Sequence, residues 1–212
     1  MSSIPLFRIF EGSINYYKSL YSNKEGYYKR FINSITLSDI LDVLKTEDEN
    51  EFQSKKEIRV YGIAFNSNIA QLTNKMGSPK FLQSVNFEGL NHTTCFYKRL
   101  FFNHRVIVQF HFINNLFFYC NMSFMNLTDR YETKLLKILN EKYRNDFEGP
   151  AVKSISDCNK NFIRFEKILW PSVIYANKNP AIRNMITKQM ELEKVVSITS
   201  HKRQTDEWRN NL

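Results

Sequence analysis

The chain has 212 residues, of which 42% are hydrophobic and 15% aromatic, so it can bury a substantial core. This composition excludes disorder over most of its length, and no apolar run is long enough for a membrane span. The formal net charge of +9 suits nucleic acid, an anionic membrane surface or an acidic protein, although the basic residues are spread along the chain.

Helices are predicted first. Apolar residues fall at helical spacing from Ile4 to about Lys45, and Ser38 is placed to cap the turn that contains Ile40 and Leu44. The charged stretch 46–57 then predicts a solvated loop. We therefore expect an N-terminal helical segment over 1–46, followed by a separate domain over 57–196.

A short strand and a helix open that domain. Ile58 and Val60 predict the strand. Asn66 or Ser67 is expected to cap the helix, and Gly77 is expected to end it.

Three β-rich runs follow, over 93–102, 105–112 and 116–124, and they predict an antiparallel meander. The first turn is expected at Asn103-His104. The second is expected to be a three-residue loop over 113–115, with Asn115 in the left-handed region.

This loop sets the register of the second hairpin. It places Phe110 opposite Phe118 and Val108 opposite Cys120 on one apolar face. His111 then lies on the opposite face, which is mixed and partly wet.

An amphipathic helix is predicted over 127–143, capped by Thr128 or Asp129. Because its apolar residues recur on one side, it is expected to lie across the apolar face of the sheet. These residues are Leu135, Leu136, Ile138 and Leu139.

The C-terminal part predicts two further strands, over 162–170 and 172–176, and a helix that Pro180 opens. This helix carries more apolar surface than one narrow stripe needs, so we expect it to contact a partner protein. The expected contact residues are Met185, Met190 and Leu192, with Trp208 in the polar tail 197–212. The alternative is that the helix packs on its own sheet.

No constellation for catalysis emerges. The histidines are His92, His104, His111 and His201, and none has the spacing of a metal site or an acid–base pair. Glycine-rich phosphate loops and nucleophile elbows are also missing from the sequence. We expect no enzyme activity, no metal and no cofactor.

The cysteines are Cys95, Cys120 and Cys158, an odd number without zinc-ligand spacing, and they predict buried thiols in a reducing compartment. Arg8 and Glu11 interrupt the N-terminal apolar residues, so no signal peptide is expected. Both observations favour a cytoplasmic protein.

One stretch resembles a known family. Gly62, Leu72, Gly77 and Pro79, followed by Tyr97 and by Phe110-x-Phe112-x-Asn114, are similar to the repeat of the β-lactamase-inhibitory-protein-like fold. That fold also occurs in small lipoproteins of the outer-membrane barrel assembly machinery. The resemblance covers residues 58–124 and implies a helix-on-sheet scaffold for protein binding; the helix–meander–helix order also resembles secretion chaperones.

These observations predict an α+β fold, an antiparallel meander with helices on one face and helical extensions at both ends. The leading hypothesis is a cytoplasmic, non-enzymatic protein-binding module, such as an adaptor, a chaperone-like factor or an inhibitor. Its partner is another protein or a second copy of the chain. The alternative hypothesis is a nucleic-acid-binding protein that uses the net positive charge.

Overall fold

The computed structural model describes residues 27–28, 35–46, 51–87, 89–144, 153–167 and 170–192. The residues from Leu37 onward form one compact unit. Helix α3 (Leu37–Lys45) belongs to this unit, although the sequence placed it in a segment ending at 46, and it starts before Ser38. The predicted tail 197–212, with Trp208, lies outside the described residues.

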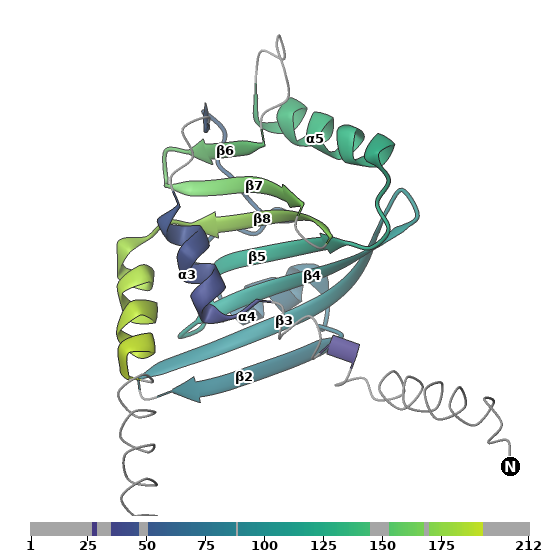
Figure 1. Ribbon diagram of the computed structural model, residues 1–212. Helices are drawn as coiled ribbons and strands as arrows, with labels where there is room; N and C mark the ends of the chain where they lie inside the picture. Colours follow the sequence, from purple (N-terminus) through teal and green to yellow (C-terminus); the bar gives the residue numbers. More distant parts are fainter. Residues whose placement is uncertain are drawn as a thin grey trace, which may run out of the picture. The chain divides into compact units, whose positions relative to one another are not determined.

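An eight-stranded sheet with the order β1-β6-β7-β8-β5-β4-β3-β2 is the centre of the unit (Figure 1). Only the pairing of β1 with β6 is parallel, so the predicted α+β class and antiparallel meander are confirmed. The strands are β1 (Phe52–Ser54), β2 (Phe81–Phe87), β3 (Leu90–Phe101), β4 (His104–Ile113), β5 (Leu116–Phe124), β6 (Ser154–Asp157), β7 (Asn161–Lys167) and β8 (Pro171–Asn177).

Strand β1 lies inside the stretch that the sequence predicted to be a solvated loop. Ser54 is buried, and its hydroxyl donates a hydrogen bond of 2.7 Å to the carbonyl of Tyr143. The predicted strand at Ile58 and Val60 is reduced to one isolated bridge, between Val60 and Ile63. The sequence did not predict β1 because charged residues surround this short strand and because its partner strand is far along the chain.

Helices α4 (Ile69–Met76) and α5 (Asp129–Tyr143) begin with different caps. Asn68, not Asn66 or Ser67, caps α4 through a capping box with Gln71. Thr128 is the N-cap residue of α5, and Gly77 ends α4, as predicted.

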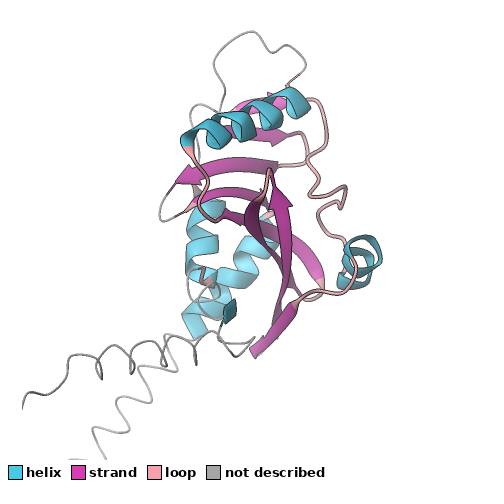
Figure 2. Cartoon of the chain, turned by 90° about the vertical axis from the view of Figure 1, so that its right-hand side faces the viewer, coloured by secondary structure: helices cyan, strands magenta, loops and turns pink. Residues whose placement is uncertain are grey.

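The two faces of the sheet differ in chemistry. One face, here called the apolar face, packs against α4 and α5 through Leu72, Leu135 and Leu139, whereas Ile138 is exposed. The opposite face, the polar face, carries buried polar residues and lies toward α3 and the last described helix, 180–192 (Figures 1 and 2). Helices therefore cover both faces, not one as predicted. The polar face is defined by Thr94, Gln109, His111, Asn121 and Ser123.

The β4–β5 hairpin turns over two residues, not the predicted three. Asn114 and Asn115 both have positive φ, 49° and 66°, which is the geometry of a type I′ turn. Ile113 then pairs with Leu116. Asparagine tolerates this left-handed backbone at both positions, so the tighter turn is available.

A β-bulge restores the alternation of the two faces after that turn. The register shifts between His111 and Phe112, so that Phe110 pairs with Cys120 rather than with the predicted Phe118. Both predicted and observed registers keep Phe110 on the apolar face. The predicted faces are thus right for β4 but not for all of β5, because Phe117 packs on Phe110 in the apolar core, whereas Phe118, which was predicted there, packs on His92 of the polar face.

The β3–β4 hairpin also turns one residue earlier than predicted. Phe102 and Asn103 have positive φ, 45° and 67°, and Phe101 pairs with His104. His104 is therefore the first residue of β4 and not a turn residue.

Candidate functional site

The helix over 180–192 packs against its own chain. It begins at Pro180, as predicted, and its buried residues are Ile182, Ile186 and Gln189. These three positions are spaced by four and three residues, which places them on one side of the helix. This side of the helix therefore packs on its own domain, which was the alternative to a partner contact.

The predicted partner-contacting residues lie beside that stripe. Met185 and Met190 are half-buried, and Leu192 is 40% exposed. The amide of Asn114, in the β4–β5 turn, lies 4.0 Å from the sulfur of Met185. Contact of these residues with a partner stays a prediction.

A pair of variants separates the two sides of this helix. Ile186→Asp should lower the melting temperature strongly, because it buries a carboxylate at a position that is 0% exposed. Leu192→Asp should leave the melting temperature nearly unchanged. Thermal denaturation followed by circular dichroism measures both, and equal effects would show that the helix has no preferred packing side.

The two edges of the sheet are unequal. Strand β1 is three residues long and is followed by charged residues, which is how proteins commonly protect an edge. Strand β2 is seven residues long, reads FLQSVNF and contains neither a charge nor a proline. Among the described residues no strand pairs with its outer side. From Leu82 onward, the outer side of β2 is therefore an edge of the sheet in the described part of the chain.

Cations lie around the start of β2. Lys80 precedes the strand and is exposed. Strand β3 extends beyond the pair Phe81–Phe96 and carries Lys98 and Arg99 there. An extended segment added to β2 would therefore meet positive charge at this end.

A second exposed cluster surrounds the β3–β4 turn. Phe102 is 42% exposed and stacks on Tyr131 of α5, with ring centroids 5.7 Å apart. The ammonium of Lys134 lies 3.8 Å from the centre of the Phe102 ring, and His104 packs on Tyr131 at 4.7 Å. The sequence pointed to basic and aromatic residues in this region and assigned Tyr97 to the core, which its 1% exposure confirms.

Two histidines meet on the polar face. The Nε2 atom of His92 lies 3.1 Å from Nδ1 of His111, and their rings stack at 5.3 Å. His111 is 2% exposed, so the predicted partly wet environment is wrong. The sequence did not reveal the pair, because local spacings alone were compared and His92 and His111 lie on different strands. The period-two pattern of β3 and β4 with the correct turn would have brought His92 close.

Burial favours the neutral forms of His92, His111 and Cys95. It lowers the pKa of His92 to about 4, and it lowers the pKa of His111 well below 6.5 with a further contribution from His92. Burial also raises the pKa of Cys95 to about 12, which disfavours the reactive thiolate. Among the described residues no group of three or more His, Cys, Asp or Glu side chains could hold a metal ion.

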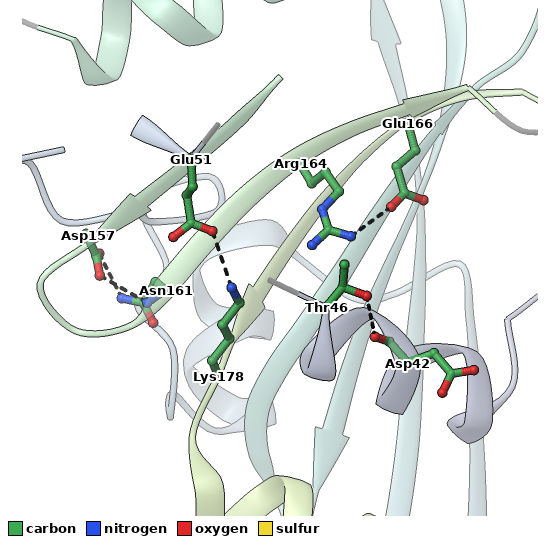
Figure 3. A network of polar contacts seen from close by, with 8 residues as sticks. All are labelled: Asp42, Thr46, Glu51, Asp157, Asn161, Arg164, Glu166 and Lys178. Atoms are coloured by element: carbon green, nitrogen blue, oxygen red, sulfur yellow. Dashed lines mark hydrogen bonds and ion pairs between the residues drawn. The ribbon is translucent and has the colours of Figure 1, made fainter. Parts of the chain in front are cut away.

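A pocket of about 340 Å³ lies where the β6–β7 turn meets the end of β8, and asparagines including Asn159, Asn161 and Asn177 line it. Asp157 holds this turn together. Its carboxylate accepts hydrogen bonds from the backbone of Ile58, Asn159 and Asn161 and from the Asn161 side chain (Figure 3). Because these bonds satisfy the turn, Asp157 and Asn161 have a structural role here.

No protein-family model, no curated protein and no solved structure matches the chain. The resemblance over residues 58–124 to the β-lactamase-inhibitory-protein-like repeat stays a prediction. Among the described residues, no helix has both the length and the apolar character needed to cross a membrane.

Proposed function

We propose that the protein is a non-enzymatic protein-binding module that accepts an extended, acidic segment of another protein along the outer side of β2. This proposal rests on β2, a seven-residue edge strand that contains no charged residue and no proline. Strand addition to such an edge takes its affinity from main-chain hydrogen bonds and its specificity from alternate side chains.

The positive charge of the chain indicates which kind of segment would bind to β2. The chain carries a net charge of +9, so a second copy would bring two strongly positive molecules together. Lys80 and Lys98 lie at the start of β2, where an acidic segment would find complementary charge. We therefore favour an acidic partner over self-association.

The cytoplasm is the compartment that we assign to this binding. Cys95, Cys120 and Cys158 are all unpaired; the first two are buried as predicted, whereas Cys158 is exposed, so the prediction of a buried thiol is wrong there. A reducing compartment keeps such thiols from forming disulfides between molecules.

Substitutions at Leu82 test the proposal. This residue lies in β2 and is 45% exposed, so its replacement should hardly change stability. The probe is a peptide of alternating valine and glutamate with blocked ends. Leu82→Glu should weaken its binding by roughly tenfold through like-charge repulsion, whereas Leu82→Lys should preserve it. Fluorescence anisotropy measures both affinities.

The same peptide with a central proline is the control, because proline cannot donate to a β-ladder. It should lose binding to the unaltered protein. Equal binding of both peptides, or equal affinities of the Glu and Lys variants, would rule out an acidic strand on β2.

Nucleic acid is a second candidate because Phe102 is exposed beside Lys134 and close in the chain to Arg105. Exposed aromatic rings among cations are typical of single-strand binding surfaces. A single-stranded oligonucleotide in the same assay should then bind with an affinity that falls steeply with salt and that Phe102→Ala reduces. Lack of binding in moderate salt would exclude this candidate.

A further inference from the structure

Strands β3, β4 and β5 bury apolar side chains on one face and several polar side chains on the other. On the apolar face, Val108 and Phe110 of β4 are 0% exposed. On the polar face of the same strand, Gln109 and His111 are 1% and 2% exposed. The polar residues are therefore buried about as deeply as the apolar ones. A strand buried on both faces is ordinarily apolar on both, so the polar face calls for an explanation.

Several buried atoms of this face have no hydrogen-bond partner. They include both amide atoms of Gln109, the Nε2 atom of His111 and the Oδ1 atom of Asn121. Leaving such atoms unpaired costs their full desolvation free energy. Further unpaired atoms on the same face belong to Gln83, Ser154, Ser156 and Arg164.

The central unpaired atoms come from adjacent residues. Gln109 of β4 pairs with Asn121 of β5, and His111 pairs with Tyr119 of β5 and Thr94 of β3. Side chains at such cross-strand positions have Cβ atoms about 5 Å apart. The side chains that carry the unpaired atoms are therefore neighbours on one face of the sheet.

Other atoms hold two of these side chains in place. Nδ1 of His111 lies 3.1 Å from His92 and 3.4 Å from the hydroxyl of Thr94. The amide nitrogen of Asn121 donates a 3.0 Å hydrogen bond to Ser123. One end of each side chain is therefore fixed, and the opposite end is left for another partner.

The covering helices do not supply that partner. Helix α3 contributes Ile40, Leu41 and Leu44 to the buried residues, all of them apolar. On β7, the side chains of Arg164 and Glu166 form an ion pair of 3.4 Å with each other (Figure 3). Neither α3 nor the helix 180–192 hydrogen-bonds the unpaired atoms of Gln109, His111 or Asn121.

We propose that the polar face at Thr94, Gln109, His111, Tyr119 and Asn121 is a binding site for a small, uncharged ligand with adjacent hydrogen-bond donors and acceptors. These five positions carry amides, an imidazole, a hydroxyl and a phenol, which have no formal charge here, and the charges of Arg164 and Glu166 on the same face are paired with each other, which favours an uncharged ligand. The amide of Gln109 offers a donor and an acceptor side by side. A nucleobase edge complements this arrangement, and sugar hydroxyls offer the same chemistry.

Two probes distinguish these sources, uridine for the base edge and D-glucose for the hydroxyls. Saturation-transfer NMR and the shift of the melting temperature report binding to the full chain. We expect uridine to bind and to raise the melting temperature. If only glucose binds, the site is supported and its ligands are compounds with hydroxyl groups rather than nucleobases. If neither probe binds and the face holds ordered water only, the proposal is overturned.

Substitutions separate a ligand site from a structural polar network. Gln109→Met keeps the side-chain size and removes two unpaired polar atoms, so it should raise the melting temperature while abolishing probe binding. Asn121→Leu should also abolish binding but change the melting temperature little, because it removes the bond to Ser123 together with the unpaired Oδ1 atom. Asn161→Leu is the matched control. Asn161 is also buried, at 3% exposure, but it bonds Asp157 and Asn177, so its loss should lower the melting temperature. A fall for Gln109→Met or Asn121→Leu as large as for Asn161→Leu would show a structural network and contradict the proposal.

Discussion

Phe110→Asp should unfold the compact unit that begins at Leu37. Phe110 is 0% exposed and packs edge-on against Tyr97 at 5.8 Å and against Phe117 at 5.3 Å. An aspartate there would bury an unpaired carboxylate and forfeit the aromatic contacts. We expect a loss above about 4 kcal/mol, which is comparable to the stability of many domains. Urea denaturation followed by tryptophan fluorescence and circular dichroism measures it.

Leu116→Asp is the control on the same hairpin. Leu116 is 42% exposed, so the charge stays in water and stability should change by less than about 0.5 kcal/mol. A cooperative transition of Phe110→Asp at the unaltered midpoint would show that the apolar face is not the core of the unit.

Local patterns predicted the central strands and α5 well. The alternation through Val106, Val108 and Phe110 identifies β4 and its apolar face without knowledge of its partners. Leu135 and Leu139, four residues apart, identify the buried side of α5. These features depend on a period of two or 3.6 residues within one segment, which the sequence displays directly.

Features that depend on distant partners could not be predicted in this way. Strand β1 exists because it pairs in parallel with β6, about a hundred residues later, and its short sequence has no alternating pattern of its own. The bulge after His111 is likewise a compromise between a two-residue turn and the need to keep Phe110 inside. Neither follows from residues close in sequence.

The candidate sites illustrate the same limit. Strand β2 is an edge strand only because the described sheet ends there, and the order of strands is a property of the whole fold. The unpaired atoms of Gln109 and Asn121 appear only when the register and both covering helices are known. By contrast, the apolar residues of the last helix were visible in sequence, although its buried side was not.

Acidification should destabilise the protein through the histidine pair. His92 and His111 face each other on the polar face with 3.1 Å between ring nitrogens, so two positive charges cannot both be accommodated there. Burial lowers the pKa of His92 from 6.5 to about 4 in the folded protein. The unfolded chain therefore binds more protons between these values, and folded-state stability falls as the pH decreases from about 6.5 to about 4.

The full difference for His92 corresponds to roughly 3 kcal/mol near pH 4, of which roughly 2 kcal/mol is reached at about pH 5. His111 acts in the same direction because its pKa is also lowered. Urea midpoints at about pH 7.5 and about pH 5 measure the effect, since both histidines are neutral in either state at the higher value. The double variant His92→Gln, His111→Gln cannot take up these protons, so its midpoint should change much less over the same interval. An unchanged decline in the double variant would assign the acid sensitivity to the carboxylates and remove the histidine pair as its cause.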